Sequence, residues 1–465
     1  MRNNAAEKLL STARTEGLLL TENGFAEFMD AADPLREHRE AFHFPKRREG
    51  GDYVYVSGNV LGLQHKDVES SVGGALKKWR DLGVMGNYQH PNPWEELESL
   101  GRKEMAAIVG AQESEVITMN SFGVNLHLLL MAFYRPKGKR RRILTWNHSF
   151  PGSTHALVSQ LEARGMNPAE DLVFVGASHG EKWEISSVNI PIEQFFSLIE
   201  KCGDEVAVAV LSGVHFFSGQ LFDIQAITKA AHAKGILVGV DCAHAVGNVP
   251  LQLHDWEVDF ACWSNYRYLN SGPGNLGGVF VHSKHTSVEN ELKPLRGWWG
   301  HDCRNCYRLY RSFELAEGAA SFQVSNVPAL GMMAMLPSVR LMAEIGMGPL
   351  REKSMLLTTY MELLLSELVP QGSMEVITPV DPNQRGAQLS IRILPNRLTL
   401  NLSLKDTYEC DTCGDSDADR MERHLCENGI IVSHYPPDVI HLAPVPLYNS
   451  FMDVLLTVRA VAECF

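Results

Sequence analysis

The middle of the chain alternates short apolar runs with amphipathic stretches, which is typical of buried strands connected by helices. Each run is rich in Val, Ile or Leu and is bounded by polar residues or glycine. The predicted strands are Arg142–Trp146, Leu172–Val175, Val206–Leu211, Ile236–Asp241 and Phe260–Trp263. Asp223–Lys234 begins with an acidic residue and is followed by Gly235, so it predicts a helix. The alternation predicts an α/β fold with a mostly parallel sheet and helices on both faces.

After Pro328 the pattern changes to that of a smaller α+β domain. Two long helical stretches precede three strand-like segments. In order these are residues 329–344, 349–368, 374–377, 388–393 and 399–404. We therefore expect three parts: an N-terminal segment, residues 1–58, that joins the small domain, a large domain, residues 59–328, and a C-terminal small domain, residues 329–465.

Composition narrows the classes of partner. The chain has 465 residues, 45% hydrophobic and 21% charged, as in an ordinary soluble globular protein. Its net charge of −13 disfavours nucleic acid and anionic lipid as partners. No apolar run reaches the roughly 18 residues that a membrane span needs. Charged residues interrupt Met1–Leu20, and the nine cysteines follow no disulfide framework, so we expect a cytoplasmic protein with reduced thiols.

Two local patterns have both a functional and an ordinary interpretation. Cys303/Cys306 and Cys410/Cys413 could together hold zinc, but about a hundred residues separate the pairs and compact zinc modules use shorter spacings. We interpret them as coincidental pairs in polar loops and predict no metal. The basic run 137–142 could be a nuclear signal or an anion patch. Its position after Pro136 and before a strand favours a solvated turn.

Polar side chains follow two neighbouring predicted strands where each strand ends. Asp241 ends one strand and is followed by His244, and Ser212 comes directly after another. Ligands bind at the carboxyl ends of the strands in an open parallel sheet. There an acid can hold a protonated ring nitrogen and an imidazole can lie beside the same ring. The polar, glycine-bearing loop 264–274 would return to this edge, although Asp after a strand is often only a helix cap.

Longer motifs carry a resemblance to a known family. The stretches LSGVHFFSGQ (211–220) and VGVDCAHAVGNVPLQLHDWEVDFACWSNYRYLNSGPG (238–274) resemble kynureninases. The resemblance continues in GNVLGLQ (58–64), MNSFGVNLHLL (119–129), GWWGH (297–301), FQVSN (322–326) and APVPLYNSF (443–451). It thus spans nearly the whole chain.

The resemblance implies a fold, a reaction and a cofactor. Kynureninases have the aspartate-aminotransferase fold, fold type I of the enzymes that use pyridoxal 5'-phosphate (PLP), and they are homodimers whose sites use both subunits. In tryptophan catabolism they hydrolyse L-kynurenine to anthranilate and L-alanine. They treat 3-hydroxykynurenine likewise, which gives 3-hydroxyanthranilate. A small-molecule ligand of the kynurenine type is therefore the expected partner.

Most of the family's cofactor pocket has a counterpart here. By resemblance Asp241 pairs with the pyridinium nitrogen and keeps PLP able to accept electrons. His244 and Phe150 match positions that pack near the ring. The other positions that match the pocket or its surroundings are Phe122, Gly123, Ser153, Ser212, Tyr266, Trp298 and Asn326.

One departure concerns the residue that binds PLP covalently. The family motif Ser-Tyr-Lys-Tyr-Leu-Asn reads Asn-Tyr-Arg-Tyr-Leu-Asn here, which places Arg267 at the lysine position. The family's lysine works as a neutral amine that attaches to PLP and later moves the proton on the substrate's α-carbon. Arginine stays protonated in proteins and is neither nucleophile nor base at neutral pH. No nearby lysine obviously replaces it, since Lys284 and Lys293 lie beyond the next strand.

Four further departures fall on pocket positions. Val60 stands where the family has a serine, and Asn87 where animal members have a histidine. Ser153 replaces the aspartate of a Phe-Pro-x-Asp motif. His441 replaces the arginine that clamps the substrate carboxylate, and imidazole cannot form that two-pronged pair.

These departures beside a well-kept scaffold predict a protein that no longer performs the family reaction. It would bind PLP, a kynurenine-type ligand or an active paralogue, with PLP held non-covalently if it binds. Two alternatives remain open at this point: an active kynureninase, and a related enzyme that acts on a different ligand. A zinc protein would rest on the cysteine pairs alone.

Overall fold

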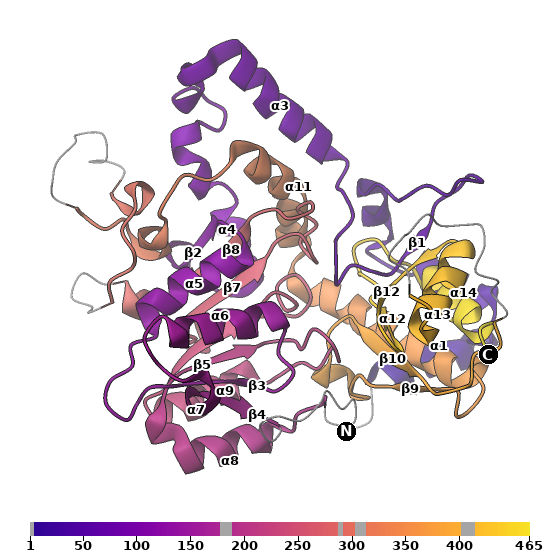
Figure 1. The fold of residues 1–465 in the computed structure, drawn as a ribbon. Coiled ribbons are helices and arrows are strands. Elements are labelled where there is room, and N and C mark those ends of the chain that lie inside the picture. Colours follow the sequence, from indigo (N-terminus) through magenta and orange to yellow (C-terminus); the bar gives the residue numbers. More distant parts are fainter. Residues whose placement is uncertain (1–3, 177–187, 287–291, 303–312, 401–413) are drawn as a thin grey trace. The chain divides into compact units, whose positions relative to one another are not determined.

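The computed structural model describes residues 4–176, 188–286, 292–302, 313–400 and 414–465 (Figure 1). The chain forms two compact units. The large unit comprises residues 67–216 and 222–347, and the small unit comprises residues 1–66, 217–221 and 348–465. Both divisions lie further along the chain than the boundaries expected after residues 58 and 328. The two cysteine pairs, Cys303/Cys306 and Cys410/Cys413, lie outside the described residues.

The large unit is built on a seven-stranded sheet with the order β2-β8-β7-β6-β5-β3-β4. Its strands are β2 (Val116–Met119), β3 (Arg142–Trp146), β4 (Leu172–Val175), β5 (Val206–Ser212), β6 (Leu237–Asp241), β7 (Phe260–Ser264) and β8 (Gly277–Val281). The five strands predicted above are confirmed to within one residue at each end. Neighbouring strands are parallel except at β8, which runs antiparallel to both β2 and β7.

Burial of the sheet on both faces explains the continuous apolar runs. Every residue of β7 and β8 is buried, and in β5 only Ser212 is partly exposed. Two glycines make room for aromatic rings inside this sheet. A Cβ on Gly239 would lie 2.2 Å from the Phe260 ring, and one on Gly278 would lie 2.2 Å from the Trp263 ring. Any larger residue at these positions would displace a core ring.

The large unit also contains α-helices, some of which pack on this sheet. They are α3 (Asp67–Leu82), α4 (Arg102–Val109), α5 (Phe122–Phe133), α6 (Pro151–Glu162), α7 (Pro168–Asp171), α8 (Ile192–Cys202), α9 (Ile224–Ala233) and α11 (Ala329–Ile345). The predicted helix 223–234 is α9, and the Asp223 side chain caps it by accepting the N–H of Ala226 at 2.9 Å. Because α11 packs on α3 and α4, it belongs to the large unit rather than to the C-terminal domain in which the sequence placed it.

The small unit combines segments from both ends of the chain. Its helices are α1 (Asn4–Glu16), α2 (Asn23–Ala31), α12 (Met347–Leu368), α13 (Asp417–Glu427) and α14 (Phe451–Ala462). An antiparallel sheet of order β12-β13-β10-β9 is formed by β12 (Ser433–Tyr435), β13 (Val439–Leu442), β10 (Leu389–Ile393) and β9 (Met374–Val376). In addition, β1 (Val54–Tyr55) pairs in parallel with β11 (Ile430–Ile431).

The predicted strand at 399–404 falls mostly outside the described residues, and its first two residues are irregular. Within the described part of the chain, no single helix is long and apolar enough to cross a membrane. The consecutive helices α11 and α12 meet that criterion only as a pair, across a break.

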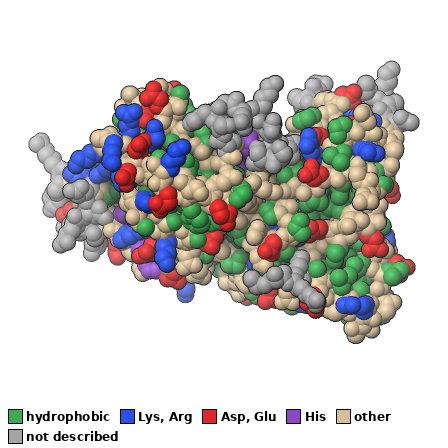
Figure 2. All heavy atoms as spheres, turned by 90° about the horizontal axis from the view of Figure 1, so that it is seen from below, with side chains coloured by type: hydrophobic (Ala, Val, Ile, Leu, Met, Phe, Trp, Pro, Cys, Tyr) green, Lys and Arg blue, Asp and Glu red, His purple; other side chains and the backbone are tan. Residues whose placement is uncertain are grey.

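The basic run 137–142 forms a turn and the start of β3. The Arg140 guanidinium donates to the carbonyl oxygen of Val206 at 2.9 Å, and Arg141 pairs with the buried Asp171 at 2.9 Å. Both arginines therefore join neighbouring segments of the large unit. Acidic and basic side chains are also interspersed over the face of the molecule seen in Figure 2.

Candidate functional site

A pocket lies in the large unit where β5, β6 and β7 end. The side chains leave a small cavity of about 40 Å³ that opens to solvent. Its lining residues are Phe122, Phe150, Ser212, Val214, Phe216, Asp241, Ala243, His244, Ser264, Tyr266 and Arg267. Parallel strands bring these residues together because their carboxyl ends share one edge of the sheet.

Strand register places the hydroxyl and the carboxylate side by side. Ser212 ends β5 and pairs with Asp241, which ends β6. The next strand continues the row, since Asp241 pairs with Cys262 on β7. Helix α5 starts at Phe122, so its first backbone N–H groups face this edge. A Cβ on Gly123 would meet no atom within 4 Å, so the space beside that helix start is open.

Asp241 is the buried acid of the pocket. Its Oδ2 accepts the hydroxyl of Ser153 at 2.8 Å, and its Oδ1 accepts the N–H of Ala243 at 3.0 Å. Burial raises the pKa of Asp241, while these two hydrogen bonds and the nearby charge of Arg267 act in the opposite direction. A buried carboxylate of this kind gains most from a cationic N–H donor, such as a protonated ring nitrogen.

Arg267 supplies the positive charge of the pocket. Its guanidinium carbon lies 5.2 Å from the centre of the Tyr266 ring, a cation–π distance. Arg267 lines the same pocket as Asp241 and acts on that carboxyl electrostatically. Among the residues that the structure describes, no lysine lines this pocket. The pocket can therefore attract an anion but offers no amine for a covalent bond.

The hydroxyl of Ser212 is buried and, within the described residues, has no hydrogen-bond partner. A buried hydroxyl left without a partner costs about 1–3 kcal/mol. Native proteins rarely leave such a group unless a ligand or water completes it. This orphaned hydroxyl, at the same edge as the open space by Gly123, indicates a site for a hydrogen-bonding ligand group.

Aromatic side chains form one wall of the pocket. Phe150, the N-cap residue of α6, meets Phe216 edge to face with ring centres 5.4 Å apart. The Phe216 ring lies 6.5 Å from that of His244. Sequence reasoning did not single out Phe216, although it follows β5 within the same stretch as Ser212. It likewise did not single out Val214, Ala243 or Ser264.

Five predicted residues of the large unit are not among those that line this pocket. Two of them adjoin it: Gly123 follows Phe122, and the Ser153 hydroxyl donates to Asp241. The other three lie elsewhere. Trp298 starts the short helix η8 (Trp298–Gly300) and is half exposed. Asn326 lines a separate hollow together with Asn120 and Ser121. Asn87 ends the short helix η2 (Gly83–Asn87).

The other two predicted substrate residues, Val60 and His441, belong to the small unit. Val60 is 41% exposed. His441 on β13 is fully buried, and its Nδ1 lies 3.3 Å from the side-chain nitrogen of Asn59. Its ring packs 4.8 Å from that of Tyr435. The imidazole is thus fixed among aromatic and amide groups, without the paired donors that an arginine would present.

Comparison with known proteins agrees with this geometry. The family Aminotransferase class-V matches residues 101–394. A kynureninase from Myxococcus xanthus is 39% identical over 96% of this chain and 98% of that protein. A kynureninase from Nematostella vectensis is 36% identical over 98% of this chain and 96% of that protein. A kynureninase from Koribacter versatilis is 40% identical over 93% of this chain and 95% of that protein.

Solved structures with low sequence identity share the fold. A mutant of the cystine C-S lyase C-DES, with glycine covalently linked to its PLP cofactor, aligns with a TM-score of 0.69 at 15% identity, covering 89% of this chain and 97% of that chain. A cysteine desulfurase from Thermococcus onnurineus aligns with a TM-score of 0.66 at 14% identity. The alignment covers 89% of this chain and 95% of that chain. The fold is therefore that of the PLP-dependent proteins of fold type I, as the sequence predicted.

Proposed function

The chain belongs to the kynureninase family, and on that premise we propose that it binds PLP without a covalent bond and does not hydrolyse L-kynurenine. The observation that carries the proposal is Arg267. Its guanidinium lines the same pocket as Asp241 and occupies the sequence position of the family's lysine.

The residues of the pocket fit the non-covalent part of a PLP site. Asp241 would hold the protonated ring nitrogen, since burial makes that carboxyl favour a cationic donor. The orphaned hydroxyl of Ser212 and the first N–H groups of α5 would receive the phosphate, which a helix N-terminus attracts. Phe150 and His244 would pack near the ring. When bound, PLP supplies an electron-withdrawing ring.

Arg267 explains why catalysis would be lost. A guanidinium stays protonated at neutral pH, so it neither attacks a carbonyl carbon nor removes a proton from a substrate carbon. It can, however, bind phosphate or a phenolic oxygen through several N–H groups. Arg267 would therefore hold an anionic ligand in the pocket rather than react with it.

The small-unit residues support the same conclusion for the substrate. His441 offers one ring N–H at a time where the family presents a guanidinium, so a carboxylate would lose one of two parallel hydrogen bonds. Val60 contributes no hydroxyl, and Asn87 in the large unit cannot act as an acid or base. A substrate that is poorly oriented reacts slowly even when the cofactor is present.

We propose further that the protein is a cytoplasmic homodimer. The large unit exposes apolar side chains on α3, on η2 and directly after η2: Leu76, Trp79, Val84, Met85 and Tyr88. Exposed apolar clusters of this kind mark interaction surfaces, and homodimer interfaces are rich in such residues. The described cysteines are free thiols, as is usual in a reducing compartment.

Attachment of the cofactor tests the proposal. The purified chain would be saturated with PLP, dialysed, and compared with an aliquot treated with borohydride before dialysis. We expect dialysis to remove PLP from the native chain, and mass spectrometry to find no PLP on a lysine that faces this pocket after borohydride. Arg267→Lys should retain PLP through dialysis and carry the adduct at residue 267. A lysine adduct at this pocket in the native chain would contradict the proposal.

A further inference from the structure

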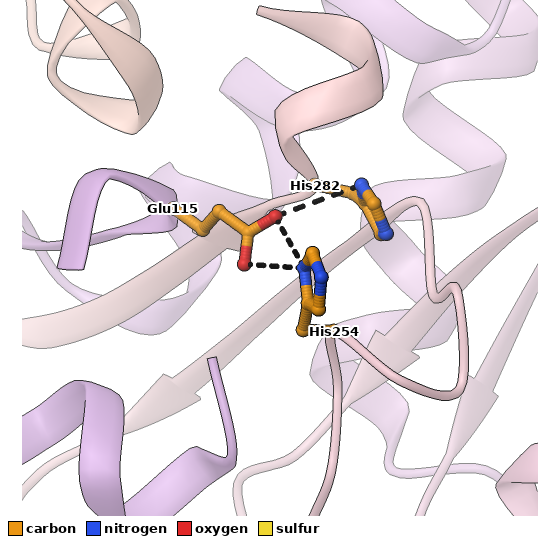
Figure 3. Close-up of side chains that lie close together, drawn as sticks. All are labelled: Glu115, His254 and His282. Atoms are coloured by element: carbon orange, nitrogen blue, oxygen red, sulfur yellow. Dashed lines mark hydrogen bonds and ion pairs between the residues drawn. The ribbon is translucent and has the colours of Figure 1, made fainter. Parts of the chain in front are cut away.

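A carboxylate and two imidazoles lie close together at the end of the sheet where β7 begins, opposite the strand ends that form the PLP pocket. Glu115 immediately precedes β2, and His282 immediately follows the antiparallel strand β8, so β2–β8 pairing brings them to one end of both strands. His254 lies on the segment that leads to β7. One ligand atom from each of the three side chains lies within 4.8 Å of the other two (Figure 3).

The distances match those of a metal centre. His254 Nδ1 lies 2.9 Å and 3.0 Å from the two carboxylate oxygens of Glu115, and His282 Nδ1 lies 3.6 Å from Glu115 Oε1. Ligand atoms at about 2.0–2.1 Å from a tetrahedral Zn²⁺ ion are roughly 3.3 Å apart. Figure 3 shows both rings presenting a nitrogen to the same carboxylate, and the rings stack with centres 4.8 Å apart.

From this arrangement we propose that Glu115, His254 and His282 bind one divalent transition-metal ion of the Zn²⁺ type. Two histidines and one carboxylate are a recurrent ligand set for such ions, and a water molecule would complete the coordination. His282 Nδ1 accepts the N–H of Lys284 at 3.1 Å, a bond that the metal would replace.

Backbone N–H groups hold the Glu115 carboxylate in place before any ion binds. Glu115 Oε1 accepts the N–H of Ser283 at 2.7 Å, and Oε2 accepts that of Gln112 at 3.0 Å. The N–H of His254 donates to the carbonyl oxygen of Gly110 at 3.0 Å. The first two bonds fix the carboxylate, and the third fixes the backbone at His254, so the carboxylate would need little ordering on binding.

A second histidine–carboxylate cluster at this end of the sheet provides a matched control. The Asp259 carboxylate accepts hydrogen bonds from His232 Nε2 at 2.8 Å and from His285 Nε2 at 2.7 Å. It also forms an ion pair with the Lys284 ammonium at 3.0 Å. Among the described residues, only the Glu115 group gathers three ligand atoms so closely. The ammonium at Asp259 would repel an added cation, so the second cluster should not bind one.

Titration with Co²⁺ tests the site, because Co²⁺ replaces Zn²⁺ and absorbs visible light. We expect the full-length chain to bind one Co²⁺ with a spectrum free of thiolate charge-transfer bands, which excludes the cysteine pairs. His254→Gln and His282→Gln should each weaken binding at least about tenfold, since even outer ligands change affinity by that factor. His232→Gln should leave binding unchanged.

His254 can be substituted without disturbing the fold, because its side chain is 31% exposed. The circular dichroism of His254→Gln should therefore match that of the native chain. The native chain should also gain thermal stability with added Zn²⁺, and His254→Gln should lose that gain. Failure to bind one ion per chain, a thiolate spectrum, or equal affinity in His254→Gln would overturn the proposal.

Discussion

At the scale of single residues, the pocket depends on contacts between positions far apart in the sequence. Ser153 attracts notice in the sequence because it replaces a family carboxylate. No sequence pattern shows that its hydroxyl donates to Asp241, which lies 88 positions away. The sequence did locate Asp241 and Ser212, because both follow apolar strands. It could not locate Phe216, whose role depends on how its ring packs on Phe150.

Ser153→Ala should weaken PLP binding. The change removes the hydroxyl that donates to Asp241 Oδ2 at 2.8 Å, so the carboxyl pKa rises further and its negative charge is less well supported. A hydrogen bond to a charged group contributes about 1.5–3 kcal/mol, which corresponds to roughly tenfold to a hundredfold in affinity. Equilibrium dialysis with PLP measures the loss.

Ser149→Ala is the matched control, because the Ser149 hydroxyl donates to the carbonyl oxygen of Trp146 at 2.9 Å and does not touch Asp241. Its PLP affinity should equal that of the native chain. Equal affinity in Ser153→Ala and the native chain would contradict the assignment of Asp241 as the ring-nitrogen partner.

At the scale of elements, apolar patterning predicts strands well because the sheet is buried on both faces. The helix start at Asp223 was also visible, since the cap is a local interaction. Strand direction is different: the pattern of β8 does not reveal that it runs antiparallel to β7, because a strand buried on both faces has the same apolar run in either direction. That direction brings His282 to Glu115.

Asp223→Ala should destabilise the protein by about 1 kcal/mol, since the N–H of Ala226 loses its acceptor. Asp223→Asn keeps an acceptor oxygen at the same position and should cost only a small part of this. Urea unfolding of both variants gives the two free energies. A loss in Asp223→Asn as large as that in Asp223→Ala would show that the cap is not the cause.

Asp259 connects α9, β6 and the segment after β8, and it should make stability depend on pH. Burial alone would raise the pKa of Asp259, but hydrogen bonds from His232 and His285 and the charge of Lys284 outweigh it, so the pKa lies below its usual value. The unfolded chain therefore takes up the proton first. The stabilisation is complete above the ordinary carboxyl pKa of about 3.9 and is lost as the pH falls below it.

Asp259→Asn should consequently reduce the free energy of unfolding by about 3 kcal/mol at pH 7. The difference from the native chain should shrink as the pH falls from about 5 to 3. Asp204→Asn is the control, because Asp204 pairs with Lys139 on the surface at 3.5 Å and should change stability by less than about 0.5 kcal/mol. A difference that stays constant with pH would contradict the assignment.

At the scale of the whole molecule, the sequence indicated the fold class and the contribution of both chain ends to a small domain. It grouped α11 with α12 because the helical pattern continues from one into the other, while membership of a unit depends on packing. The apolar face of α11 packs on α3 and α4, which lie more than 200 positions earlier in the chain. Patterning along the chain does not contain that information.

The exposed apolar side chains on α3, on η2 and directly after η2 predict a dimer. Light scattering at micromolar concentration should give twice the chain mass of 51.7 kDa. Trp79→Glu places a charge at an exposed apolar position of α3 and should shift the mass toward that of one chain. Lys229→Glu, a charge change on α9, should leave the dimer intact. A monomeric native chain would contradict the proposed assembly.

Turnover of L-kynurenine tests the central claim most directly. The native chain, Arg267→Lys, His441→Arg and the double variant would be assayed with saturating PLP for anthranilate formation. We expect no enzymatic turnover in the native chain and little in Arg267→Lys, with kcat/KM of the double variant exceeding that of both single variants because the two residues act on one substrate. Anthranilate formation by the native chain at an ordinary enzymatic rate would contradict the account.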